Sequence, residues 1–154
     1  MTPVTAAATL AQQFHEQQVT WIHRWNPGLM SLRISRPDTY RFLPGQFARI
    51  GIRTEDGQLL WRAYSIVSAP GEDFLEFFLV ILPNGEFSGR VGRFNLGSVV
   101  LLDPAAQGFL TLERFKRLNP VEDLWMFATG TGLAPYLSML RDAAVWTRFR
   151  HIVL

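Results

Sequence analysis

The sequence predicts a mainly β protein, with an antiparallel six-stranded barrel followed by the start of an α/β domain. Up to residue 103, short apolar or alternating segments recur between turn residues, as in small antiparallel barrels. From residue 119 the pattern becomes a strand, a glycine-rich turn, a helix and another strand, which is the order that produces a parallel sheet. The length of 154 residues suits one barrel and part of a second domain.

The first predicted strands form a hairpin. Met30, Leu32 and Ile34 alternate with polar residues, which indicates a half-buried strand over residues 29–35. The turn residues "NPG" connect it to the β-rich segment "QQVTWIHRW". The segment "SGRVGRFN" has no β pattern, so we expect a short helix over residues 88–95. Turn pairs such as Pro-Gly and Asp-Gly separate the other predicted strands, over residues 46–53, 58–67, 73–82 and 98–103.

The C-terminal segment has a different residue pattern. "LWMFATGTGLAPYLSMLRDAAV" predicts an apolar strand, a glycine turn and one amphipathic helix, and "RHIVL" predicts a second strand. One βα unit cannot cover both faces of a parallel sheet. We therefore expect the sequence to be a fragment of a longer enzyme, truncated within this domain. The expected division is a lead-in over residues 1–17, a barrel over 18–118 and an incomplete α/β domain over 119–154.

Composition excludes several classes of function. There are 15 basic and 13 acidic residues and no basic run, which argues against a nucleic-acid partner. The absence of cysteine excludes disulfides, thiolate zinc sites and cysteine-ligated clusters, and the three histidines lack metal-ligand spacing. The N-terminus lacks the features of a secretory signal, and no window approaches the about 18 apolar residues of a membrane span. We expect a cytoplasmic protein with no metal and no membrane partner.

The stretch "WRAYSIVSAP" places three chemically distinct side chains within four positions. The guanidinium of Arg62 suits a phosphate, the ring of Tyr64 suits a flat heterocycle, and the hydroxyl of Ser65 can hydrogen-bond a ring nitrogen. Together they suit a dinucleotide that carries a planar redox ring. The simpler interpretation is an ordinary barrel strand with alternating exposed side chains.

Two further motifs point to a nucleotide. In "PNGEFSGRV", Ser88 opens the predicted helix, whose free N–H groups suit a phosphate, although plain capping by Ser88 would explain the pattern equally well. In "ATGTGLAPYLSML", glycines allow a backbone to approach a ligand at a strand-to-helix crossing, and Pro135 suits the first helical turn. A tight packing turn is the alternative there. No catalytic dyad or triad is visible, so the chain is interpreted as a cofactor holder.

Taken in order, these motifs resemble the ferredoxin–NADP reductase superfamily, and in detail the bacterial ferredoxin/flavodoxin–NADP reductases. The matching segments are "GQFARIGI", "WRAYSIVSAP", "LEFFLVILPNGEFSGRV" and "LWMFATGTGLAPYLSML". The resemblance runs from about residue 18 to residue 154. It implies an FAD-binding barrel followed by an NADP-binding α/β domain.

The resemblance also implies residue roles. Arg62 would contact the FAD pyrophosphate, Tyr64 would stack on the isoalloxazine ring, and Ser65 would bond near N5, the hydride acceptor. Tyr64 and Ser65 are thereby the catalytic candidates. The implied FAD-binding set is Arg62, Ala63, Tyr64, Ser65, the main chain of Leu79, Val80 and Ile81, then Glu86, Phe87, Ser88 and Thr131. The implied NADP-binding set is Thr129, Gly130, Thr131, Gly132 and Pro135.

The implied activity is FAD-dependent electron transfer between NADPH and ferredoxin or flavodoxin. Residues that grip the 2′-phosphate of NADP are expected beyond residue 154, so we expect FAD retention with little NADPH-dependent dye reduction. The alternatives are a flavin-binding module or reductase fragment without turnover of its own, a reductase subunit of an oxygenase, and a purely structural barrel.

Overall fold

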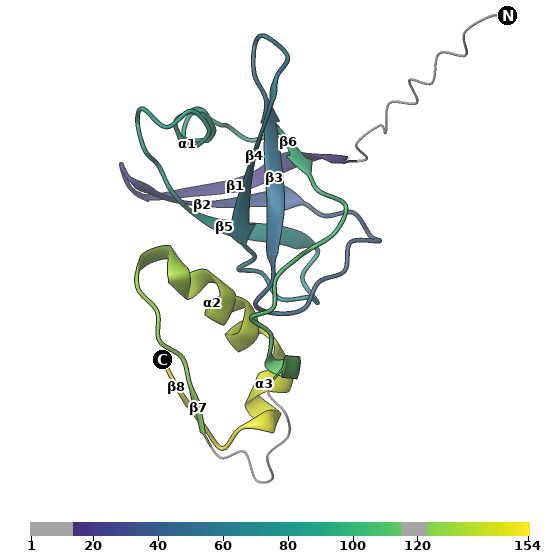
Figure 1. The fold of residues 1–154 in the computed structure, drawn as a ribbon, viewed down its shortest axis with the longest axis vertical. Coiled ribbons are helices and arrows are strands. Elements are labelled where there is room, and N and C mark those ends of the chain that lie inside the picture. Colours follow the sequence, from purple (N-terminus) through teal and green to yellow (C-terminus); the bar gives the residue numbers. More distant parts are fainter. Residues whose placement is uncertain (1–13, 115–122) are drawn as a thin grey trace, which may run out of the picture.

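The computed structural model describes residues 14–114 and 123–154. In this part of the chain, six antiparallel strands form one sheet, and a short parallel pair of strands lies apart from it (Figure 1). The sheet strands are β1 (His15–Asn26), β2 (Leu29–Ser35), β3 (Phe47–Arg53), β4 (Leu59–Ser65), β5 (Phe74–Val80) and β6 (Val99–Leu102). The mainly β, antiparallel architecture predicted from the sequence is therefore confirmed.

The large sheet curls so that its two edge strands meet. The strand order is β4-β3-β6-β1-β2-β5, which leaves β4 and β5 at opposite edges. Just beyond the end of β4, Ile66 forms an isolated bridge with Phe77 of β5, and the Val67 N–H donates to the Glu76 carbonyl at 2.8 Å. Backbone groups that would otherwise be exposed on an edge are paired there.

The core lies between the inward faces of the curled sheet. Leu32 and Phe77 pair across β2 and β5 and are both fully buried, as the alternating pattern predicts. Each such side chain contributes about 1.5–3 kcal/mol by leaving water. Phe87 and Val91, from the segment that contains helix α1 (Ser88–Val91), belong to the same core cluster. The core therefore fixes α1 on the barrel.

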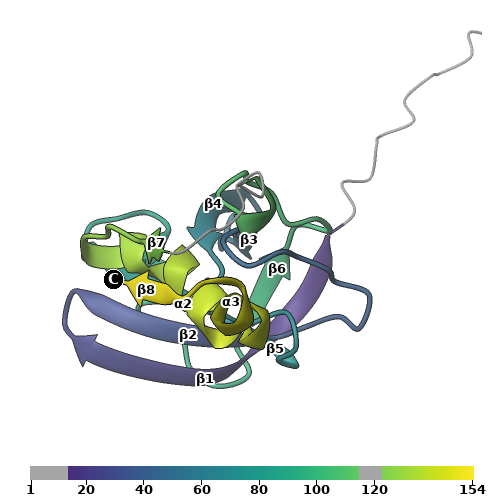
Figure 2. The same ribbon diagram turned by 90° about the horizontal axis from the view of Figure 1, so that it is seen from below.

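The C-terminal segment lies against one end of the sheet, with helix α2 nearest to it (Figures 1 and 2). Its β7 and β8 pair in parallel, with Leu124 opposite Ile152, which confirms the predicted strand, helix, strand order. The elements are β7 (Asp123–Trp125), the 3₁₀ helix η2 (Gly130–Leu133), α2 (Ala134–Arg141), α3 (Ala143–Arg148) and β8 (His151–Val153), while the 3₁₀ helix η1 (Leu112–Arg114) follows the barrel.

Two predicted helices differ from the observed ones. The helix expected over residues 88–95 ends at Val91, because Gly92 follows and packs closely against Ile81. The single helix expected after the glycine turn breaks at Asp142, whose extended backbone ends α2. The Asp142 carboxylate accepts from the Ala144 N–H at 3.0 Å and so caps α3, which shows that local capping overrides the amphipathic pattern.

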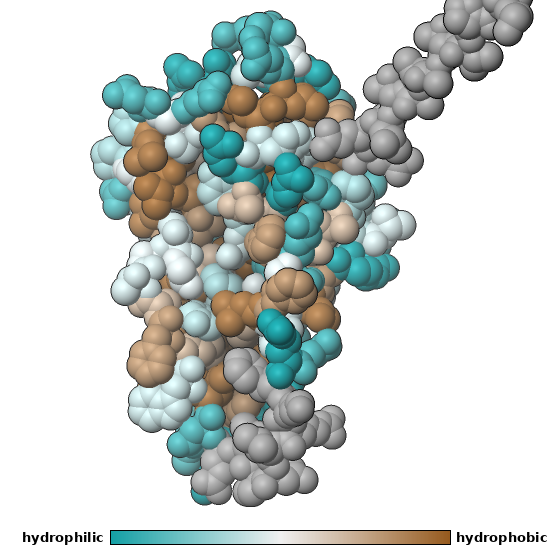
Figure 3. All heavy atoms as spheres, viewed as in Figure 1, coloured by the Kyte–Doolittle hydropathy of each residue, from teal (hydrophilic) through white to brown (hydrophobic). Residues whose placement is uncertain are grey.

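Some predictions cannot be compared with the structure. Most of the lead-in lies outside the described residues, as does the connector over residues 119–122. No helix in the described ranges is both long enough and apolar enough to cross a membrane. On the face drawn in Figure 3, apolar residues form separate patches between hydrophilic ones.

Candidate functional site

A cavity of about 330 Å³ opens between β4, β5, the loop before α1 and η2. These elements come from distant parts of the sequence, and the curled sheet brings them together. The lining residues are Arg62, Tyr64, Phe78, Val80, Leu82, Gly85, Glu86, Phe87, Ser88 and Thr131.

Strand β4 presents Arg62 and Tyr64 to this cavity because they lie on the same face of the strand. The Arg62 guanidinium is exposed and donates to the neighbouring Trp61 carbonyl at 2.7 Å. Within the described residues, no carboxylate pairs with Arg62. The cavity therefore has a cation at its edge whose charge is available to an anion.

Tyr64 supplies an aromatic surface. Its ring is half-buried and lies 5.9 Å from the ring of Phe87, with 34° between the two planes. Burial raises the pKa of the Tyr64 hydroxyl above its ordinary value of 10.0, and the charge of Arg62 opposes this only in part. The side chain is consequently neutral at physiological pH.

The loop before α1 is held closed by Ser88. Its Oγ accepts a hydrogen bond from the Leu82 N–H at 3.1 Å, whereas no side chain caps the helix. The capping role considered from the sequence is therefore wrong. A Cβ at Gly85 would lie 2.6 Å from Ser88 Oγ, so a larger residue there would displace the hydroxyl that closes the loop. Glu86 is exposed and adds a negative charge at the rim.

The glycine turn reaches the cavity through Thr131. Gly130 has a φ of +54°, in the left-handed region that favours glycine. Additional Cβ atoms at Gly130 or Gly132 would meet nothing within 4 Å, so the backbone of this turn is open to the surroundings. Thr129 is exposed, whereas Pro135 is buried in the first turn of α2.

The structure brings together part of the predicted site. The predicted residues that line the cavity are Arg62, Tyr64, Val80, Glu86, Phe87, Ser88 and Thr131. Leu79 is buried in the core, and the other members of the implied FAD-binding set, Ala63, Ser65 and Ile81, do not line the cavity. Of the implied NADP-binding set only Thr131 lines it, whereas Thr129, Gly130, Gly132 and Pro135 do not. Phe78, Leu82 and Gly85 were not predicted. The alternation of β5 could have identified Phe78, because it lies on the same face as Val80.

A larger cavity of about 570 Å³ lies near α1 and the ends of β3 and β6. Its lining includes Arg53, Arg90 and Arg93 but none of the predicted site residues. This larger cavity is therefore separate from the site predicted from the sequence.

The curled antiparallel sheet places an arginine, a tyrosine and a glycine turn around one cavity, which is the arrangement that the resemblance to the ferredoxin–NADP reductase superfamily led us to expect. No family model matches the chain. It is 38% identical to ferredoxin–NADP reductase A of Sorangium cellulosum (strain So ce56) over 92% of this chain and 49% of that protein. It is 34% identical to the flavodoxin/ferredoxin–NADP reductase of Rhodobacter capsulatus over 99% of this chain and 54% of that protein.

A solved structure agrees with these relatives. The ferredoxin NADP+ reductase from Neisseria gonorrhoeae with bound FAD and NADP superposes with a TM-score of 0.83 at 41% identity, covering 90% of this chain and 55% of that one. The predicted resemblance is therefore confirmed: the chain is homologous to ferredoxin/flavodoxin–NADP reductases over most of its own length. The chain spans about half the length of the curated relatives it matches.

Proposed function

We propose that the cavity beside Tyr64 binds FAD and that the chain forms the flavin-binding part of an FAD-dependent oxidoreductase. The activity proposed is electron transfer between NADPH and ferredoxin or flavodoxin. The observation that carries the proposal is the convergence of Arg62, Tyr64 and Thr131 around one cavity in a chain similar to these reductases. The proposed division remains a barrel up to residue 118 and a partial NADP-binding domain from residue 119.

The chemistry of the lining residues fits FAD. The cofactor combines a flat ring with a pyrophosphate, and the cavity combines an aromatic side chain with an arginine that no described carboxylate neutralises. Its volume of about 330 Å³ is within the range of small-molecule sites. When bound, FAD would supply the redox chemistry, which no side chain of the chain offers.

The protein's own contribution is orientation and electrostatics. Arg62 would hold the phosphates, with the Glu86–Ser88 loop beside them, and Tyr64 would present a neutral aromatic surface to the ring. Ser65 and the main chain of residues 79–81 are proposed to bond the ring edge. The turn containing Thr129, Gly130, Thr131, Gly132 and Pro135 is proposed to receive the nicotinamide nucleotide. We propose a cytoplasmic location and a soluble redox partner, since the names of the relatives include ferredoxin and flavodoxin.

FAD binding is tested directly on the purified chain. Absorption spectroscopy detects flavin, and release followed by chromatography distinguishes FAD from FMN. We expect Arg62→Ala and Tyr64→Ala each to weaken FAD binding by roughly 10- to 100-fold. A charge-assisted hydrogen bond such as that of Arg62 contributes about 1.5–3 kcal/mol, and stacking of a flat ring on an aromatic side chain such as Tyr64 contributes about 1–3 kcal/mol. Arg53→Ala is the matched control, because Arg53 does not line this cavity.

Two outcomes would contradict this proposal. A colourless chain that cannot be reconstituted with FAD or FMN would leave the purely structural barrel as the function. Unchanged FAD affinity in both variants would remove Arg62 and Tyr64 from the site.

A second candidate function is a flavin-binding module without nicotinamide-dependent turnover of its own. The observation that favours it is that the relatives named as reductases are about twice as long as the matched region. NADPH-dependent dye reduction by the FAD-loaded chain separates the candidates. Turnover favours the reductase, whereas retained FAD with no turnover favours the module.

A further inference from the structure

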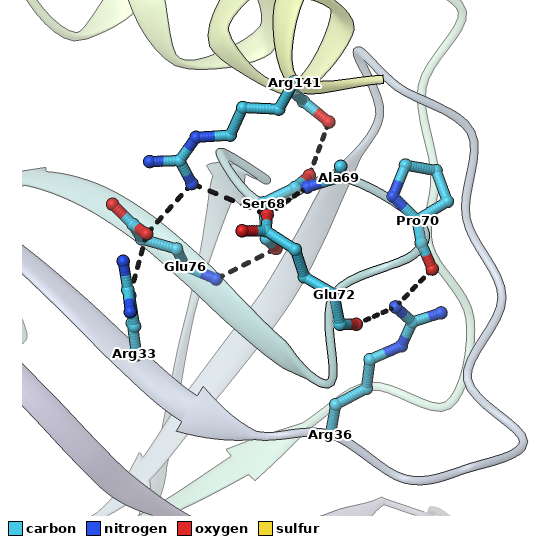
Figure 4. A network of polar contacts seen from close by, with 9 residues as sticks. Arg33, Arg36, Ser68, Ala69, Pro70, Glu72, Glu76 and Arg141 are labelled. Atoms are coloured by element: carbon cyan, nitrogen blue, oxygen red, sulfur yellow. Dashed lines mark hydrogen bonds and ion pairs between the residues drawn. The ribbon is translucent and has the colours of Figure 1, made fainter. Parts of the chain in front are cut away.

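Helix α2 is joined to the barrel by a small set of polar contacts (Figure 4). Ser138 is fully buried, and its Oγ donates to the Ser68 carbonyl at 2.7 Å. One turn later, Arg141 Nη1 lies 3.0 Å from Glu76 Oε2 and 3.6 Å from Glu72 Oε2. Residues three apart share one face of a helix, so these two side chains act together. We call the contacts of Ser138 and Arg141 with these three barrel residues the brace.

The barrel side of the brace is itself fixed. Ser68 Oγ accepts from the Glu76 N–H at 3.1 Å, which locks the segment after β4 to β5. Glu72 Oε2 accepts from the Ala69 N–H at 2.6 Å and so holds the turn in shape. Arg36 Nη1 donates to the carbonyl of Glu72 at 2.7 Å from the opposite side of that turn. Helix α2 is thus attached to a rigid part of the barrel.

Both ends of the brace lie close in sequence to the cavity. Ser68 follows the end of β4, the strand that carries Arg62 and Tyr64. Helix α2 directly follows η2, which carries Thr131 into the same cavity. A displacement of α2 relative to Ser68 would therefore change the distance between Thr131 and the β4 side chains.

We propose that Ser138 and Arg141 are positioning residues, which fix the glycine turn relative to the cavity wall formed by β4. The part of this proposal that concerns a flavin rests on the proposed function. The part that concerns the position of the turn rests only on the contacts of the brace.

Arg141 can be replaced without leaving a buried charge unpaired. The Glu76 side chain is only 7% exposed, but its Oε2 also accepts from Arg33 Nε at 2.9 Å. Loss of Arg141 therefore leaves Glu76 with one partner, whereas loss of Glu76 would remove the carboxylate of Arg33 and leave Arg141 with Glu72 alone. Because Arg141 uses a single nitrogen for both carboxylates, a lysine should substitute for it better than at a bidentate site.

The position of the turn is measured by electron paramagnetic resonance. The chain has no cysteine, so spin labels attach only at introduced sites, for which Thr20→Cys on β1 and Thr129→Cys at the start of the glycine turn suit because both residues are exposed. We expect one narrow distance distribution in the parent and a broad one in Ser138→Ala/Arg141→Gln. The control variant Arg53→Gln should keep the narrow distance distribution of the parent. The double variant Ser138→Ala/Arg141→Lys should have a distribution much narrower than that of Ser138→Ala/Arg141→Gln. Urea unfolding of every variant verifies that each is folded, and the single variants serve if the double variant is not.

The link to the cavity is measured with FAD as the probe. We expect the visible circular dichroism of bound FAD to change in Arg141→Gln and to recover in Arg141→Lys. A distribution that stays narrow in the folded double variant would overturn the brace, and an unchanged flavin spectrum alongside a broadened distribution would overturn the positioning role. If the chain binds no flavin, the proposed function fails while the distance measurement still decides the brace.

Discussion

The barrel and the segment from β7 to β8 differ in how they treat apolar side chains. The barrel buries its large residues on one continuous inner surface, and Leu32 and Phe77 are inaccessible to solvent. The C-terminal segment buries a few residues such as Met139 but leaves Trp125 and Phe127 exposed. Parallel strands are usually covered on both faces, whereas Trp125 of β7 and Val153 of β8 are exposed.

This difference in burial indicates that the two regions are stabilised by different kinds of contact. The barrel is fixed by its own core, whereas the C-terminal segment depends on its contacts with the barrel, among which the brace and the packing of Met139 are prominent. The site lies where the two regions meet, so its geometry depends on how firmly the C-terminal segment is attached to the barrel.

The largest expected effect on stability comes from comparing the same substitution, phenylalanine to alanine, in the two regions. Phe77→Ala should lower the free energy of unfolding by about 3–5 kcal/mol, since it leaves a cavity in the core. Phe127→Ala should change it by less than about 0.5 kcal/mol, because the Phe127 side chain is 80% exposed. Urea unfolding followed by circular dichroism measures both values. Similar losses for the two would mean that the regions share one core.

The next effect tests the junction of the two regions. Gly45 has a φ of +98°, and a Cβ there would overlap the Leu110 carbonyl oxygen and lie 2.5 Å from Met139 Cε. Gly45→Ala should cost about 1–3 kcal/mol from backbone strain alone, with the overlap adding to it. Gly57→Ala is the matched control, since its φ is +85° and no atom lies within 4 Å of the added Cβ. Equal unfolding free energies for the two variants would show that the junction yields to the extra atom.

The sequence predicted most of the barrel because its physical signal is local. Alternation identified the buried residues of β2, and turn pairs separated the strands. The brace was not predictable in this way. Glu76 resembles an interruption of an apolar strand, and its arginine partners are 43 and 65 residues away in sequence. Only the closure of the sheet and the docking of α2 bring these charges together.

The site was likewise predicted only in part. Arg62 and Tyr64 share a strand face, so their convergence follows from alternation alone. Leu82 and Gly85 are held together by the Gly85 N–H, which donates to the Leu82 carbonyl at 2.8 Å. Ser88 Oγ closes the same loop by accepting from the Leu82 N–H, whereas the sequence suggested Ser88 only as a cap. A serine in the first turn of a short helix can accept from an N–H of that helix or from an N–H of the preceding loop, and Ser88 accepts from the Leu82 N–H of the loop.

A smaller effect on stability is expected from a buried hydroxyl group inside the barrel. The Tyr40 side chain is buried, and its Oη has no hydrogen-bonding partner among the described residues. Tyr40→Phe should therefore raise the free energy of unfolding by about 1 kcal/mol, because an unsatisfied buried hydroxyl is removed. Urea unfolding at neutral pH measures the change. A loss of stability instead would show that the hydroxyl is solvated or bonded in solution.

The same residue gives a pH dependence. Burial raises the pKa of Tyr40 above its ordinary value of 10.0, and the charge of Asp103 raises it further. The unfolded chain then loses this proton first, so stability should fall as the pH rises above 10.0 toward the pKa of the folded state. Tyr40→Phe should reduce the slope, and the raised pKa of Tyr64 should supply part of what remains. An unchanged slope in Tyr40→Phe would contradict this assignment.

The smallest effect lies in the exposed hairpin between β3 and β4. The pKa of Asp56 is lowered from 3.8, chiefly because Thr54 Oγ1 donates a hydrogen bond to its carboxylate. The stability from this contact should be present above pH 3.8 and lost as the pH falls through the lowered pKa. Asp56→Asn should thus lower the melting temperature slightly at neutral pH and match the parent in acid. Asp73→Asn is the control and should show no such convergence, because Asp73 is exposed and its carboxylate makes no hydrogen bond or ion pair with the described residues.

Phe78 borders two cavities of the molecule. It lies on the same face of β5 as Glu76 and Val80. It lines the cavity of about 330 Å³ that contains Tyr64 and also a mainly apolar cavity of about 420 Å³ beside Trp25 and Leu137. The space open to a ligand beside Tyr64 therefore depends on the rotamer of a side chain that also borders the second cavity, so a ligand that turns the Phe78 ring changes the shape of both.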